Sequence, residues 1–96
     1  MRVRFVHLFP AIATRHSDTM DAIFLVDGQS VTVAIWCAAL NELREREGKV
    51  LSDQQLAEIA ALHLRRILEE GVDPTQAELF LGKARLRELA TELGYL

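Results

Sequence analysis

Apolar residues alternate with polar or small residues on both sides of an Asp-Gly pair, which is the pattern of a β-hairpin. Asp27 and Gly28 both tolerate the positive φ angles that a two-residue type I′ turn requires. Pairing outward from this turn leaves one mixed face and one almost wholly apolar face. The apolar face consists of Met20, Ala22, Phe24, Val26, Val31, Val33 and Ile35. A slip of one residue would exchange the two faces, so the pattern predicts a single register.

The other elements follow from changes in hydrophobic periodicity. Residues 2–7 alternate and predict a strand that ends at Pro10 and joins the hairpin in a three-stranded sheet. A period near 3.6 then predicts helices over residues 36–47, 53–70 and 74–93. Ser52 and Gln55 form a capping-box pair, and Pro74 suits the first turn of the last helix. We expect a single α+β domain over residues 1–96, with a small antiparallel sheet of two to three strands packed against two to three helices.

The last of these helices carries two apolar sectors. One sector, with Ala77 and Phe80, is placed to cover the hairpin, and the other has no obvious partner within so short a chain. The second sector consists of Leu79, Leu86, Leu89 and Leu93. Burying four leucines would contribute about 6–12 kcal/mol before association costs. The pattern therefore predicts a two-fold homodimer whose interface includes this stripe.

The hairpin and the start of the next helix resemble a known protein family. The Val-Asp-Gly turn, the following Val- and Ile-rich strand and the Ala39-Leu40 pair are similar to a family of short bacterial proteins known as domain of unknown function 1488. The similarity covers residues 23–43. Val33 stands where the family tends to have cysteine, Cys37 falls four residues later, and Trp36 follows the hairpin instead of a tryptophan preceding it. The family has no established activity, so the resemblance implies an α+β fold and no site residues.

Composition and charge narrow the class of protein. The formal net charge is −3, with basic and acidic residues interspersed, which gives no general attraction to phosphate backbones. Cys37 is the only cysteine, which excludes an internal disulfide and is typical of a reducing, cytoplasmic compartment. His7 and Pro10 interrupt the N-terminal apolar run, which argues against a secretion signal, and no apolar segment reaches the roughly 18 residues of a membrane span. We expect a cytoplasmic protein with no membrane partner.

Two basic clusters suggest an alternative function, a small nucleic-acid-binding regulator. The basic residues concerned are Arg65, Arg66, Lys83, Arg85 and Arg87. Glutamates at positions 69, 70, 88 and 92 stand among them, which favours a solvated face of balanced charge over a phosphate-binding one.

Few residues offer catalytic chemistry. His63 falls on the apolar sector of the second helix, where it is either a buried general base or, more commonly, a hydrogen-bonded histidine at the edge of the core. Cys37 lies at a strand-to-helix junction that could lower its pKa, although a small buried hydrophobe is its commoner role.

Other polar motifs are weaker still. His16-Ser17-Asp18 has the residue types of a catalytic triad but adjoins no oxyanion motif, and the histidines lack metal-ligand spacing. We therefore expect no catalytic, cofactor or metal site, and a non-enzymatic protein-interaction module acting as a homodimer. A small hydrolase or isomerase built on His63 or Cys37 is the weakest alternative.

Overall fold

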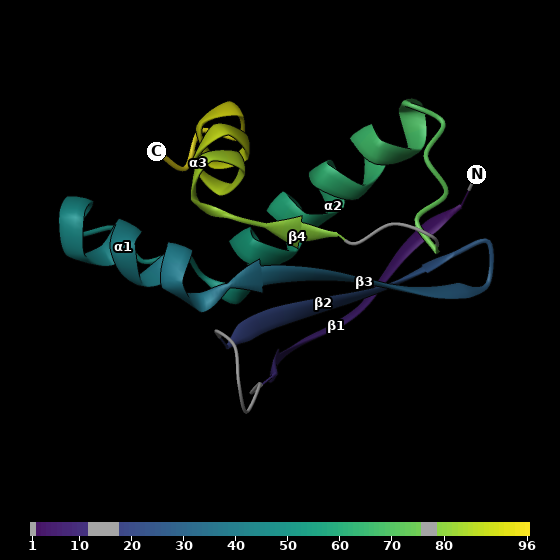
Figure 1. Cartoon of the computed structure of the whole chain (residues 1–96), viewed down its shortest axis with the longest axis horizontal. Coiled ribbons are helices and arrows are strands. Elements are labelled where there is room, and N and C mark those ends of the chain that lie inside the picture. Colours follow the sequence, from purple (N-terminus) through teal and green to yellow (C-terminus); the bar gives the residue numbers. More distant parts are fainter. Residues whose placement is uncertain (1, 12–17, 76–78) are drawn as a thin grey trace.

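The chain folds as an α+β structure with a mixed four-stranded sheet (Figure 1). This computed structural model describes residues 2–11, 18–75 and 79–96. In chain order the elements are β1 (Val3–Ala11), β2 (Thr19–Val26), β3 (Gln29–Trp36), α1 (Cys37–Glu47), α2 (Asp53–Glu69), β4 (Phe80–Leu81) and α3 (Lys83–Glu92). The strand order is β1-β2-β3-β4, and β4 runs parallel to β3 while the other neighbours are antiparallel. The expected fold class is confirmed, but an antiparallel sheet of only two to three strands is wrong.

The Asp-Gly hairpin forms in the predicted register. Val26 lies opposite Gln29 and Phe24 opposite Val31, and the pairing continues to Thr19 and Trp36. Asp27 and Gly28 have φ angles of 50° and 84°, as a type I′ turn requires. The turn also contacts the residue before β1, because Arg2 N donates a 2.9 Å hydrogen bond to Asp27 Oδ1.

Strand β1 is longer than the predicted strand over residues 2–7. It continues through Pro10, which lies opposite Met20. A proline is tolerated there because β1 is an edge strand, on which one row of backbone groups needs no ladder partner. The register shifts between Phe5 and His7, so Val6 is the extra residue of a β-bulge.

The predicted helix over residues 74–93 is wrong at residues 74–75 and 79–82, and residues 76–78, with Ala77, lie outside the described residues. Asp73 does not cap a helix; its side chain accepts hydrogen bonds from the backbone N–H and the hydroxyl of Thr75, which closes a local turn. Further on, Leu79 O accepts a 2.8 Å hydrogen bond from Ala34 N, which brings the chain alongside β3. Gly82 is the N-cap of α3, so this helix begins at Lys83, nine residues after the predicted start at Pro74.

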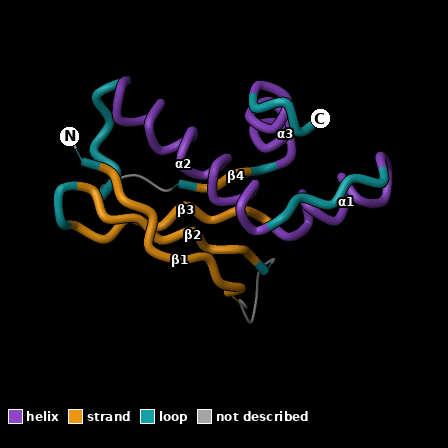
Figure 2. Tube along the Cα trace, turned by 180° about the vertical axis from the view of Figure 1, so that it is seen from behind, coloured by secondary structure: helices purple, strands orange, loops and turns teal. Residues whose placement is uncertain are grey.

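The helices bury one face of the sheet. In Figure 2, α2 and α3 lie on the same side of the strands, and α1 extends beyond the end of β3. The strand positions that face the helices are the predicted apolar face of the hairpin, and they pack with buried residues of all three helices. The buried core consists of Ala22, Phe24, Val26, Val31, Val33, Ile35, Ala39, Leu56, Ile59, Ala60, Leu64, Leu79, Leu81, Leu86, Leu89 and Ala90.

This core contains most of the leucine stripe that we assigned to a dimer interface. Leu79, Leu86 and Leu89 are at most 4% exposed, and only Leu93 remains partly exposed, at 36%. The inference that the stripe has no partner within the chain is therefore wrong. Because β4 replaces the first part of the long helix, α3 packs over the core through these leucines, which have little surface left to bury in a dimer.

Candidate functional site

The face of the sheet opposite the helices is the most distinctive surface of the described chain. Side chains alternate between the two faces of a strand, and the partners in each register pair share a face. The residues of the second face, which we call the open face, are Arg4, His7, Phe9, Thr19, Asp21, Ile23, Leu25, Ser30, Thr32, Ala34, Trp36 and Phe80. None of them is buried, although the side chains at their centre, Ile23, Leu25 and Ala34, are half-buried.

Three large aromatic side chains are exposed on the open face. Phe9, Trp36 and Phe80 are 38%, 43% and 48% exposed, which places them among the most exposed large apolar residues described. Trp36 and Phe80 meet edge-to-face with ring centroids 6.2 Å apart, and Phe9 lies 5.2 Å from the His7 ring. The aromatic groups thus stand at both sides of the sheet, on β1 and on the β3–β4 pair. Thr19 and Asp21 of β2 lie between these two groups. Exposed aromatic surface of this kind is typical of an interaction site.

Trp36 occupies a position that a small polar residue would fill better. It is the N-cap of α1, with φ −68° and ψ 125°, and its side chain makes no capping hydrogen bond. Serine, threonine, aspartate or asparagine at an N-cap stabilises a helix by about 1 kcal/mol relative to a residue that cannot cap. The indole therefore stands on the open face, where it packs against Phe80 and does not cap α1.

Charged groups lie toward opposite ends of the open face. Arg4 pairs with Leu25, close to the hairpin turn, whereas Asp21 pairs with Phe9, toward the far end of the sheet. Asp21 is half-buried and accepts a 2.7 Å hydrogen bond from the Thr19 hydroxyl, which holds the carboxylate in place. The face therefore has a positive end and a negative end, separated by apolar side chains.

The basic residues proposed for nucleic-acid binding are mostly paired with glutamates. Lys83 and Arg87 of α3 form ion pairs with Glu42 and Glu47 of α1. These contacts tie the two helices together, and the Lys83 hydrogen bond is the main reason why the pKa of Glu42 is lowered.

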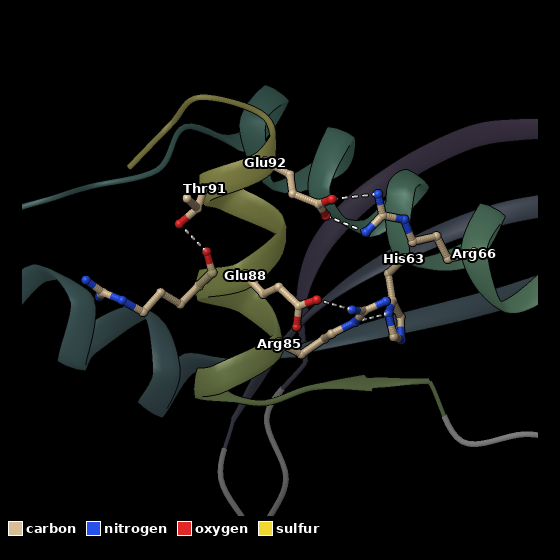
Figure 3. A network of polar contacts seen from close by, with 7 residues as sticks. His63, Arg66, Arg85, Glu88, Thr91 and Glu92 are labelled. Atoms are coloured by element: carbon tan, nitrogen blue, oxygen red, sulfur yellow. Dashed lines mark hydrogen bonds and ion pairs between the residues drawn. The ribbon is translucent and has the colours of Figure 1, made fainter.

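The same helix is tied to α2 on its other side (Figure 3). Arg66 of α2 binds both carboxylate oxygens of Glu92 of α3, with one contact of 2.8 Å. Arg85 contacts Glu88 within α3 at 3.0 Å. The pKa of Glu92 is lowered chiefly by the Arg66 hydrogen bond. Arg65 is exposed on α2. The five basic residues are thus not gathered as free cations on one surface, which removes most of the electrostatic reason for binding phosphates.

His63 lies where α2 faces α3, half-buried, and its polar partner is a cation (Figure 3). Arg85 Nε donates to His63 Nδ1 over 3.4 Å, so the imidazole accepts at Nδ1 and is neutral with its proton on Nε2. Burial lowers the pKa of His63, Arg85 lowers it further, and Glu70 opposes the shift. This environment is that of a structural histidine at the edge of the core.

Cys37 is the first residue of α1, and its thiol is not activated. Burial raises its pKa, and the carboxylates of Asp18 and Asp21 raise it further. A raised pKa lowers the fraction of reactive thiolate, which disfavours nucleophilic chemistry at this position. His16 and Ser17 of the triad-like stretch lie outside the described residues.

Metal sites, membrane spans and related proteins remain to be considered for the described part of the chain. Within residues 2–11, 18–75 and 79–96, no group of three or more histidine, cysteine or acidic side chains is arranged to hold a metal ion. None of the helices described is long and apolar enough to cross a membrane. No family model, curated protein or solved structure matches the chain. The similarity to domain of unknown function 1488 therefore stays a prediction.

The sequence patterns did not predict that Phe9, Trp36 and Phe80 lie on the open face. Trp36 and Phe80 were assigned to helices, where they fitted the 3.6-residue period, and Phe9 was placed beyond the end of the first strand. Strand alternation continued across Trp36 would have placed it on the mixed face of the hairpin. For Phe9 the alternation of Val3 and Phe5 predicts the opposite, buried face, because the bulge at Val6 shifts the pattern. Phe80 offered no such signal, because β4 has only two residues.

Proposed function

We propose that this protein is a non-enzymatic interaction module that forms a homodimer through the open face of its sheet. The observation that supports this most is the exposure of Phe9, Trp36 and Phe80 on a sheet face that the helices leave uncovered. Two sheets that pack face to face, about 10 Å apart, are a standard way of burying such surfaces. This interface takes the place of the predicted leucine-stripe interface, because Leu79, Leu86 and Leu89 are buried in the core.

The exposed aromatic area is large enough to matter. An aromatic side chain carries about 150–250 Å², so an exposure of 38–48% leaves roughly 60–120 Å² on each ring. At about 25 cal/mol per Å², burying one ring contributes about 1.5–3 kcal/mol. Three rings from each of two copies contribute about 9–18 kcal/mol, against association costs of about 4–15 kcal/mol. We therefore expect a reversible dimer in the micromolar range, helped by Ile23 and Leu25.

The charges of the open face favour a second copy in one orientation. A two-fold axis that lies between the sheets and perpendicular to the strands reverses the strand direction. It places the Arg4 end of one copy over the Asp21 end of the other. Each dimer then contains two symmetric Arg4–Asp21 contacts, and the aromatic side chains at the Asp21 end of one copy cover the hairpin end of the other. Parallel stacking would instead oppose like charges.

Sedimentation velocity over a range of protein concentrations tests this proposal. The wild type should shift from monomer toward dimer with rising concentration, and Arg4→Glu should weaken the association because it opposes two carboxylates. Arg65→Glu is the matched control, since Arg65 is an exposed arginine on α2, away from the open face. A wild type that stays monomeric up to millimolar concentration, or equal weakening by both variants, would contradict the proposal.

A further inference from the structure

A groove lies between the outer edge of β1 and the first half of α2. Its volume is about 600 Å³, and Phe5, Val6 and Leu8 line it on the strand side. β1 is the edge of the sheet farthest from β4, and within the described residues its outer side pairs with no strand (Figure 1). Unpaired backbone N–H and C=O groups therefore border an apolar recess. This combination is what strand addition uses, since the backbone supplies affinity and the recess accepts alternate side chains.

The apolar side chains on the strand side of the groove are exposed to solvent. Phe5 and Val6 are each 44% exposed, although Phe5 packs edge-to-face on the buried Phe24 with ring centroids 5.6 Å apart. The helix contributes Ala57 and Ala61, whose small side chains leave the recess free. A pair of alanines facing an exposed phenylalanine leaves room for a side chain of valine or leucine size from another segment.

The rim of the groove is acidic. Asp53 and Glu58 of α2 line it, and Gln54 is bonded to the Glu58 carboxylate at 3.4 Å. The lining includes no lysine or arginine, and its basic side chain is His7, which the register of β1 places on the open face. Arg4 is close along β1 but belongs to the open face, away from α2. An occupant that presents a basic side chain beyond its apolar ones therefore matches the charge of this site.

We propose that this groove binds a short extended segment of another protein, which adds to β1 as a fifth strand, turns two apolar side chains into the recess and places a lysine or arginine against Asp53 and Glu58. The β-bulge at Val6 divides β1, so it suits a short segment and interrupts the long ladder that edge-to-edge pairing of two copies would need. A second copy would also bring a second acidic rim to the same seam. The groove shares His7 with the open face, but none of the variants that test the groove belongs to that face.

The test uses a synthetic peptide of sequence Thr-Val-Thr-Val-Thr-Lys-Thr, in which alternate positions place two valines and the lysine on one side. Titration into the labelled full chain, followed by two-dimensional NMR, should shift the amide signals of β1 and of the first half of α2. We expect weak binding that the Glu58→Lys variant reduces by about fivefold or more, since it replaces an attraction with a repulsion. Glu69→Lys, an exposed glutamate at the other end of the same helix, is the control and should bind as the wild type does.

A peptide with glutamate in place of lysine completes the charge exchange. It should bind the wild type more weakly than the lysine peptide and bind Glu58→Lys more tightly than the wild type. Ala57→Leu, which fills the recess, should abolish binding of either peptide while the chain stays folded. The proposal is overturned if lysine and glutamate peptides bind equally, if the shifted signals lie elsewhere, or if millimolar peptide causes no shift. A failure here leaves the dimer untouched, because the variants of the open face report on that separately.

Discussion

Trp36 permits the sharpest test, because its replacement should change association and helix capping in separable ways. We expect Trp36→Ser to weaken the proposed dimer strongly. With 43% of roughly 150–250 Å² exposed, the indole leaves about 65–110 Å² to bury, or about 1.6–2.7 kcal/mol. Two copies lose this contribution, so the dimer loses about 3–5 kcal/mol. At 1.4 kcal/mol per factor of ten, its dissociation constant should rise by about 10²–10⁴-fold.

Trp36→Ala supplies the matched comparison for folding. Both variants lose the same packing against Phe80, but only serine can accept a hydrogen bond from the first turn of α1, where the wild type makes no side-chain cap. Trp36→Ser should therefore be about 1 kcal/mol more stable than Trp36→Ala. The comparison must be made at protein concentrations where both variants are monomeric, because association adds to apparent stability.

Sedimentation equilibrium and urea unfolding followed by circular dichroism measure the two effects. The two variants should associate equally weakly and differ only in their unfolding midpoints. Association of either variant at the wild-type strength would show that the indole is outside the interface. Equal stability of the serine and alanine variants would show that the N-cap of α1 is not at position 36.

Three further predictions concern the core, the histidine and the basic residues. Leu89→Ala should lower the free energy of unfolding by about 2–5 kcal/mol, because Leu89 is fully buried. Leu93→Ala should lower it much less, because Leu93 is 36% exposed. Equal losses in urea unfolding would contradict the assignment of Leu89 to the core. Burial and Arg85 lower the pKa of His63 below 6.5 in the folded chain. The unfolded chain therefore binds more protons than the folded chain below pH 6.5. The free energy of unfolding should fall as the pH drops from 6.5 through the pKa of the folded chain. His63→Gln should flatten this part of the stability profile, and an unchanged slope would show that the imidazole is not protected. Finally, the protein should not retain labelled duplex or single-stranded DNA or RNA even at low salt, since glutamates pair with Arg66, Lys83 and Arg87. Salt-sensitive retention that Arg65→Glu abolishes would instead favour the nucleic-acid alternative.

The sequence by itself determined the elements whose signals are local. The hairpin register depends on two turn residues with positive φ and on alternation over a few residues on each side, and the structure has the same pairs. The start of α2 is equally local: Ser52 and Gln55 exchange hydrogen bonds with each other's backbone, as their spacing predicts. The buried face of the hairpin followed from the same alternation.

Only the tertiary structure decided where the last segment of the chain goes. The apolar spacing of Leu79 and Phe80 fits a helix as well as a strand, and what selects a strand is the edge of β3, where Ala34 N donates to Leu79 O. That pairing moved the leucine stripe into the core and left Phe80 beside Trp36 on the open face. Backbone hydrogen bonds between distant segments carry no signature in local periodicity. Neither the parallel strand nor the place of Phe80 was therefore accessible from the pattern alone.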